Sequence, residues 1–182
     1  SGRGGRDLCP GQFRRGPLLT RSERRRLLQY TADAVAGRVP ILAGALEPSV
    51  DRAVEAACDA EEMGASVVVL TTPYYVVSDQ SMHVRFVEAI LERTSLPVML
   101  YNIPSATGHR FEPETVAYLA QNPRIVGLKD SSGDLASVQE ILRLTRDLDF
   151  SVFQGAERLC ALSLLAGVDG LVPGLGNVAP AL

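Results

Sequence analysis

Short apolar runs alternate with amphipathic segments along most of this 182-residue chain. The runs are apolar throughout, which is typical of parallel strands that are buried on both faces. They predict strands at 39–44, 66–71, 97–101, 124–128, 150–154 and 168–172. The segments between them have helical periodicity, and they predict helices at 48–63, 78–93, 112–121, 134–147 and 156–166, after a first helix that Ser22 opens and that runs to about Ala36.

The helix boundaries carry recognisable start signals. Ser78 precedes Asp79, Asp134 precedes an apolar segment, and Pro113 lies in the first turn of its helix. One strand and one helix repeat about every 25 to 30 residues, which predicts a parallel sheet with right-handed crossovers. The fold class is therefore α/β.

Six such units fit either an open doubly wound sheet or part of a (β/α)₈ barrel. An open sheet usually carries a glycine-rich nucleotide loop, and neither GxGxxG nor GxxxxGK[ST] occurs here. A complete barrel needs about 250 residues and two further strands. Candidate site residues cluster where strands are expected to end, which is where barrel enzymes place their chemistry. These are the polar residues Thr71, Thr72, Tyr74, Tyr75, Tyr101, Asn102 and Lys129, together with Gly155, Pro173 and Gly174.

Lys129 is the sole lysine, and the other seventeen basic residues are arginines. An arginine stays protonated and cannot attack a carbonyl, whereas a lysine desolvated at the end of a buried strand can become a nucleophile. Lys129 is therefore a candidate for Schiff-base formation. The alternative is that an arginine-rich composition left one lysine by chance, which would favour a solvated helix face.

Four motifs carry a family resemblance. TTPYY at 71–75, YNIPSATG at 101–108, GLKDSSGD at 127–134 and FQG at 153–155 resemble the dihydrodipicolinate synthase and N-acetylneuraminate lyase family of pyruvate-dependent class I aldolases. The resemblance implies a (β/α)₈ TIM barrel, present as an incomplete barrel of about strands 3 to 8 that is truncated at both ends. The domain would span 17–182, after an aberrant Arg/Gly-rich segment at 1–16.

The resemblance also implies roles for individual residues. Lys129 would form an imine with pyruvate or another 2-keto acid, Tyr101 would donate and accept protons, and Tyr75 would be lent across a dimer interface into the neighbouring site. The substrate-binding residues would be Thr71, Thr72, Gly155 and Val172. No metal or organic cofactor is implied, and the intact protein is expected to be a homo-oligomer, a dimer of dimers.

Ala106 departs from the synthase pattern, which places an arginine there to clamp the carboxylate of the aldehyde substrate. This favours an aldolase for 4-hydroxy-2-oxoglutarate or a 2-keto-3-deoxy sugar acid. The alternatives are 4-hydroxy-tetrahydrodipicolinate synthase of lysine biosynthesis, and a catalytically inactive fragment. The family's Gly-Thr-Thr-Gly-Glu loop is also replaced, by GQFRRG at 11–16.

The charge distribution suggests a function of another class. Residues 1–26 hold eight arginines against Asp7 and Glu23 in a chain of net charge −3, which is the pattern of a polyanion-binding arm. No nucleic-acid motif follows it, so binding to nucleic acid is not expected. We therefore expect polyanion binding less than a reading-frame error in 1–16, which would also explain the uneven charge.

The remaining composition favours a globular domain without a membrane anchor. Hydrophobic residues make up 46% of the chain and charged residues 21%, and no run reaches the roughly 18 apolar residues of a membrane span. Secretory signal features are also missing, so we expect a soluble cytoplasmic protein. The three cysteines are far apart and fit neither a disulfide framework nor a zinc site.

Overall fold

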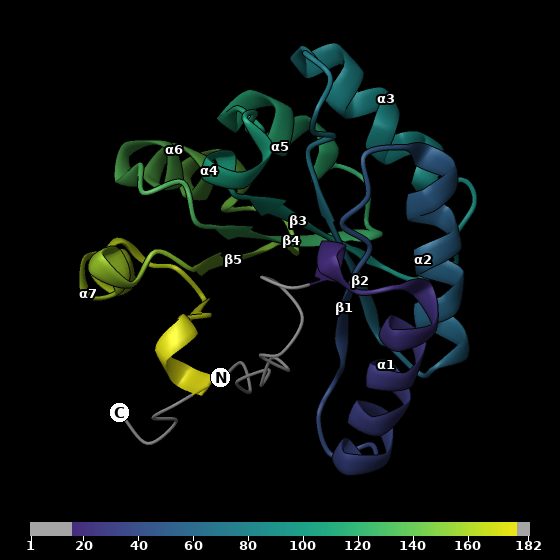
Figure 1. Ribbon diagram of the computed structural model, residues 1–182. Coiled ribbons are helices and arrows are strands. Elements are labelled where there is room, and N and C mark those ends of the chain that lie inside the picture. Colours follow the sequence, from purple (N-terminus) through teal and green to yellow (C-terminus); the bar gives the residue numbers. More distant parts are fainter. Residues whose placement is uncertain (1–15, 178–182) are drawn as a thin grey trace.

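The computed structural model describes residues 16–177. Six parallel strands pair in sequence order, β1-β2-β3-β4-β5-β6, so that each strand lies beside the next one in the chain. The sheet is curled and carries its helices on the outer side, as Figure 1 shows. This is part of a (β/α)₈ barrel, and the predicted fold is confirmed. The proposed segment at 1–16 lies, except for Gly16, outside the described residues.

The six strands lie close to where the apolar runs predict them. They are β1 (Leu42–Gly44), β2 (Val67–Thr71), β3 (Val98–Asn102), β4 (Ile125–Asp130), β5 (Ser151–Gln154) and β6 (Gly170–Leu171). β1 and β6 are shorter than their predicted runs, whereas β4, which the sequence predicts to end at 128, is longer. The strand continues through Lys129 and Asp130 because both residues pair with Tyr101 and Asn102 of β3 and with Phe153 and Gln154 of β5.

The helices follow the predicted order, with one addition. They are α1 (Arg21–Val35), α2 (Val50–Glu62), α3 (Gln80–Leu91), α5 (Pro113–Leu119), α6 (Leu135–Thr145) and α7 (Cys160–Ala166). The addition is α4 (Pro104–Thr107), a single turn after β3. Short 3₁₀ segments lie at Gly16–Leu18, Glu157–Leu159 and Gly174–Asn177.

Two helix starts differ from the prediction. The N-cap of α1 is Thr20 rather than Ser22, because Thr20 and Glu23 form a reciprocal capping box in which each side chain bonds the other residue's backbone N–H. The N-cap of α3 is Asp79 rather than Ser78, and its carboxylate accepts from Met82 N at 2.8 Å. Asp134 caps α6, as predicted.

The strands present two different faces, because successive side chains of a strand point to opposite sides. The outer face carries a large apolar core that packs against the helices, and Val68, Leu70, Val98, Leu100 and Leu128 all belong to it. A smaller cluster lies on the inner face of the curl and is made of Leu42, Leu46, Val69, Met99, Tyr101 and Phe153. The inner face also carries Lys129, which is two positions after Gly127 on β4.

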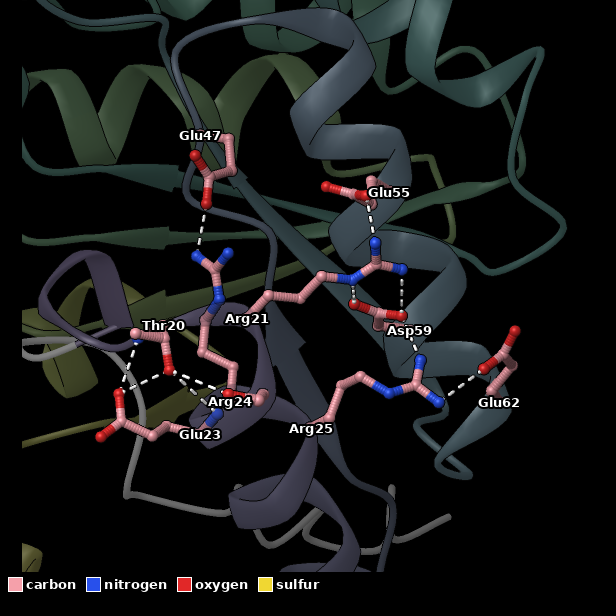
Figure 2. A network of polar contacts seen from close by, with 10 residues as sticks. Thr20, Arg21, Glu23, Arg24, Arg25, Glu47, Glu55, Asp59 and Glu62 are labelled. Atoms are coloured by element: carbon pink, nitrogen blue, oxygen red, sulfur yellow. Dashed lines mark hydrogen bonds and ion pairs between the residues drawn. The ribbon is translucent and has the colours of Figure 1, made fainter.

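An ion-pair network fastens α1 to α2 (Figure 2). Arg21 holds the buried carboxylate of Asp59 with two nitrogens, at 2.7 and 2.9 Å, and Arg25 pairs with the same carboxylate. Burial opposes ionisation of Asp59, but the hydrogen bonds and charges of the two arginines outweigh it and lower its pKa. Arg24 pairs with Glu47. Arg21, Arg24 and Arg25 belong to the predicted polyanion-binding arm. Each of them is paired with a carboxylate of the protein itself.

Candidate active site

Lys129 and Tyr101 lie side by side on neighbouring strands. They are direct partners in the β3–β4 register, and Nζ of Lys129 lies 4.2 Å from the centroid of the Tyr101 ring. Both side chains are buried, Lys129 at 6% exposure and Tyr101 at 4%. An amine and a phenol are thus held on the inner face, out of bulk water. Their proximity is the arrangement that the sequence predicted for imine chemistry.

Gly155 supplies room for the lysine. It follows β5, and its N–H donates to Asp130 O at 2.7 Å. A Cβ at this position would lie 2.9 Å from Cε of Lys129 and 2.3 Å from Oγ of Ser131. Any side chain at 155 would therefore displace the lysine or the serine. Gly155 lines the predicted site, although it does so by being small rather than by offering a polar group.

Thr71 and Val172 flank this arrangement. Thr71 is the register partner of Tyr101 on β2, and its buried Oγ1 has no hydrogen-bond partner in the described part of the chain. Val172 follows β6, packs against the inner cluster and donates its N–H to Gln154 O at 2.8 Å. The structure therefore brings both residues to the inner face. Their role in substrate binding stays a prediction.

Thr72 is committed to a different contact. Its hydroxyl donates to Oγ1 of Thr107 at 3.0 Å and lies 3.4 Å from His109 O, and both threonines are buried. These bonds fix the loop after β2 against the loop after β3. These contacts do not test the prediction that Thr72 binds substrate.

Tyr75 does not join Lys129 and Tyr101 within one chain. Its side chain is fully exposed, whereas theirs are buried. Its backbone has φ +75°, a left-handed conformation that costs a non-glycine residue energy. Val76 and Val77 beside it are also exposed. A tyrosine presented outward on a strained turn is compatible with the predicted role across an interface.

The residue that sequence reasoning missed is Asp130. It is completely buried on the outer face, where its carboxylate accepts from Asn102 Nδ2 at 3.2 Å and from Ser132 N and Oγ at 2.9 and 2.7 Å. Burial raises the pKa of this carboxyl, while the bonds from Ser132 and Asn102 oppose the rise. The signal in the sequence was the acid that directly follows the sole lysine.

A cavity lies away from Lys129. It has a volume of about 620 Å³ and opens between the start of α1, the start of α2 and the loop after β2, and Arg24, Glu47, Arg52 and Tyr74 are among its lining residues. Tyr74 donates from its hydroxyl to Leu46 O, and its pKa is raised by burial and by the charge of Glu47. Neither Lys129 nor Tyr101 lines this cavity.

Comparison with known proteins identifies the family. The family model described as the dihydrodipicolinate synthetase family matches residues 15–182, which is most of the chain. The chain belongs to this family. The predicted family resemblance is therefore confirmed.

Similar members of the dihydrodipicolinate synthetase family include named synthases. The chain is 36% identical over 162 residues to 4-hydroxy-tetrahydrodipicolinate synthase of Methanosphaerula palustris, a match that covers 89% of this chain and 55% of the relative. The dihydrodipicolinate synthase of Thermotoga maritima has a TM-score of 0.89 at 32% identity, and 95% of this chain covers 60% of that one. The chain thus spans little more than half the length of these relatives.

A third similar structure is a family member that carries a different name. The prophage protein YagE of E. coli K12, solved in complex with pyruvate, has a TM-score of 0.88 at 30% identity, and 95% of this chain covers 59% of YagE. These neighbours support the assignment of the six strands to part of a barrel.

Residues 16–177 offer neither a cluster of metal ligands nor a membrane-spanning helix. No group of three or more His, Cys, Asp or Glu side chains there could hold a metal ion. No helix in that range has the length and apolar character needed to cross a membrane.

Proposed function

We propose that Lys129 forms an imine with the keto carbon of pyruvate or a related 2-keto acid, in a class I aldolase reaction that makes or cleaves a carbon–carbon bond. The observation that carries this proposal is the buried Lys129 amine, 4.2 Å from the Tyr101 ring centroid. Burial favours the neutral, nucleophilic form of an amine over its charged form.

The chemistry follows from the two side chains. The amine adds to the keto carbon, and loss of water gives a protonated imine, which withdraws electrons from the neighbouring carbon. Loss of a proton or of an aldehyde from that carbon then leaves an enamine that can attack a second carbonyl. The phenol of Tyr101, whose ring lies beside Nζ of Lys129, is the group that we propose to pass protons during these steps. No metal or organic cofactor takes part in the proposed reaction.

The names of the relatives favour aspartate semialdehyde as the partner aldehyde, which would make the complete protein a 4-hydroxy-tetrahydrodipicolinate synthase. A second candidate is cleavage of 4-hydroxy-2-oxoglutarate or a 2-keto-3-deoxy sugar acid. The observation that favours it is Ala106, which lies exposed on α4 directly after β3 and has no charge with which to hold a second carboxylate.

We also propose that the complete protein is a homo-oligomer, arranged as a dimer of dimers. Support comes from the exposed apolar turn at Tyr75, Val76 and Val77, which a second copy would cover. Tyr75 would then enter the partner's site.

Borohydride reduction in the presence of pyruvate tests the imine. Mass spectrometry of the digested chain should find one reduced three-carbon unit on Lys129, and the Lys129→Arg variant should lack it. The N-terminal amine serves as an internal control, because it is the other primary amine of the chain. Labelling of the N-terminus alone would refute the assignment.

The aldehyde is tested with Ala106→Arg. The variant and its parent are compared in a chimaera in which the Methanosphaerula palustris relative supplies the rest of the barrel. If the missing arginine excludes aspartate semialdehyde, the substitution should raise condensation with it by roughly 10-fold or more, since a charge-assisted bidentate contact is gained. Efficient condensation of aspartate semialdehyde by the parent, which keeps Ala106, would instead favour the synthase function.

A further inference from the structure

A buried hydrogen bond joins the ends of β3 and β4 on the face of the sheet opposite to the lysine. Asn102 Nδ2 donates to Asp130 Oδ2 at 3.2 Å, and both side chains are almost completely buried. Asn102 follows Tyr101 and Asp130 follows Lys129, and each pair is in register across the two strands. The Asn102–Asp130 bridge therefore lies directly behind the two candidate catalytic residues.

Each partner of the bridge also holds a loop. Asn102 exchanges two bonds with the backbone of Phe111, donating from Nδ2 to its O at 3.1 Å and accepting at Oδ1 from its N at 2.8 Å. Asp130 Oδ1 accepts from the N and Oγ of Ser132. The bridge thus connects the segment after α4 with the turn after β4, and its polar atoms are well satisfied for a buried site.

Backbone hydrogen bonds join the end of β4 to the segments on both sides of it, at the end of β3 and after β5. Ser131 N donates to Asn102 O at 2.8 Å, and Gly155 N donates to Asp130 O at 2.7 Å. Gly155 forms the wall of the site beside Cε of Lys129, where an added Cβ would lie 2.9 Å from that atom. A displacement of Asp130 would therefore move both the backbone that carries the lysine and the wall beside it.

We propose that the Asn102–Asp130 bridge is a positioning pair that holds Lys129 over the Tyr101 ring for imine formation. This inference rests on the proposed function of Lys129. A lysine side chain has four rotatable bonds, so the position of its amine depends strongly on the backbone that carries it and on the residues that surround it. A misplacement of about 1 Å can lower a rate by around 100-fold.

The test exploits the sole lysine of the chain. Incorporation of ¹³C-lysine gives one side-chain spin system, and an Nζ near the ring centroid of Tyr101 places the neighbouring Cε protons where the ring current shifts their resonance upfield. The shift reports the position of Lys129 without any turnover. The rate of borohydride trapping with pyruvate is the second measurement.

Asn102→Asp hardly changes the shape of the side chain. It breaks the bridge because it sets two carboxyl groups against each other. The double variant Asn102→Asp/Asp130→Asn restores a donor and an acceptor to the bridge. Like the single variant Asn102→Asp, it lacks the bond to Phe111 O, so the two differ in the bridge alone. Asn102→Leu is a second disrupting variant, which cannot share a proton with Asp130. Thr145→Val is the matched control, since it removes a buried hydrogen bond from Thr145 to Ile141 O in α6.

We expect the lysine resonance of both disrupting variants to move toward that of free lysine and their trapping rate to fall roughly 10-fold or more. The double variant should recover both, and Thr145→Val should change neither. Folded Asn102→Asp or Asn102→Leu protein with the wild-type resonance and trapping rate would overturn the proposal. If the wild-type chain forms no adduct, the proposed function fails, and the resonances still decide whether the bridge positions the lysine.

Discussion

Gly155 and Lys129 are matched in shape, because a methyl group on Gly155 would lie 2.9 Å from Cε of the lysine. It would also come within 2.3 Å of Ser131 Oγ. Contacts this short force a side chain to move, and one of the two neighbours is the candidate nucleophile. We therefore expect Gly155→Ala to slow pyruvate trapping on Lys129 by roughly 10-fold or more, since the amine loses its position.

The trapping rate is to be measured beside that of Thr145→Val, which removes a buried hydrogen bond to Ile141 O within α6. The control should react like the wild-type chain. Equal rates for Gly155→Ala and the wild type would show that the lysine has more freedom than its buried surroundings suggest.

Tyr101→Phe separates the two contributions of the tyrosine. The ring that lies under Nζ of Lys129 remains, and the hydroxyl that can carry a proton is lost. General acid–base catalysis contributes about 100- to 10,000-fold, so the trapping rate should fall within that range. The ring-current shift of the lysine resonance should persist. A large change in that shift would mean that the hydroxyl serves to position the lysine.

The sequence predicts the fold well because the signals are local and periodic. Each buried strand is a continuous apolar run, and the polar residues at 71, 101 and 129 fall on strands that pair side by side. Parallel pairing in sequence order then brings Lys129 and Tyr101 together. The candidate pair therefore follows from strand order and from one unusual residue type.

The parts that could not be predicted depend on contacts between distant segments. The extension of β4 through Asp130 comes from pairing on both sides, and turn residues follow it at once in the sequence. The bond between Asn102 and Asp130 spans 28 positions. A single sequence gives the identity of such residues but not which of them meet.

Gly127 sets the spacing between β4 and β5. A Cβ there would lie 2.4 Å from the backbone oxygen of Ser151, which cannot move without separating the strands. Gly127→Ala should therefore lower the free energy of unfolding by about 1–3 kcal/mol, the usual cost of overpacking. Urea unfolding followed by circular dichroism measures this, with Gly176→Ala as the control because its new Cβ would make only an ordinary contact at 3.9 Å. A loss of similar size in both variants would show that the close approach to Ser151 is not the cause.

The last prediction concerns His83, a buried histidine behind the loop after β2. Its Nε2 lies 2.9 Å from Ser78 Oγ, and its ring packs edge-on against His109 and Phe111. Its Nδ1 has no hydrogen-bond partner in residues 16–177. Protonation would bury a positive charge and a second N–H donor in this place. Burial and the neighbouring His109 accordingly lower the pKa of His83, while Asp79 acts against them.

This shift fixes the direction of a pH effect on stability. The unfolded chain takes up a proton at His83 near its ordinary pKa of 6.5, and the folded chain does so only at a lower pH. Between these two values the unfolded state binds more protons, so the stabilisation is complete above pH 6.5 and is lost as the pH falls toward the folded-state pKa. Each pKa unit by which folding lowers the pKa of His83 corresponds to about 1.4 kcal/mol of unfolding free energy.

The His83→Gln variant isolates this contribution, because glutamine is polar and has no charge to gain. Unfolding free energies of the wild type and the variant are to be measured from pH 7.5 to about pH 5, where most carboxylates remain ionised. The stability of the wild type should fall more steeply with decreasing pH than that of the variant, and the two curves should run parallel above pH 7. Parallel curves over the whole range would show that His83 keeps an ordinary pKa in the folded protein, and that its unpartnered Nδ1 finds an acceptor when it is protonated.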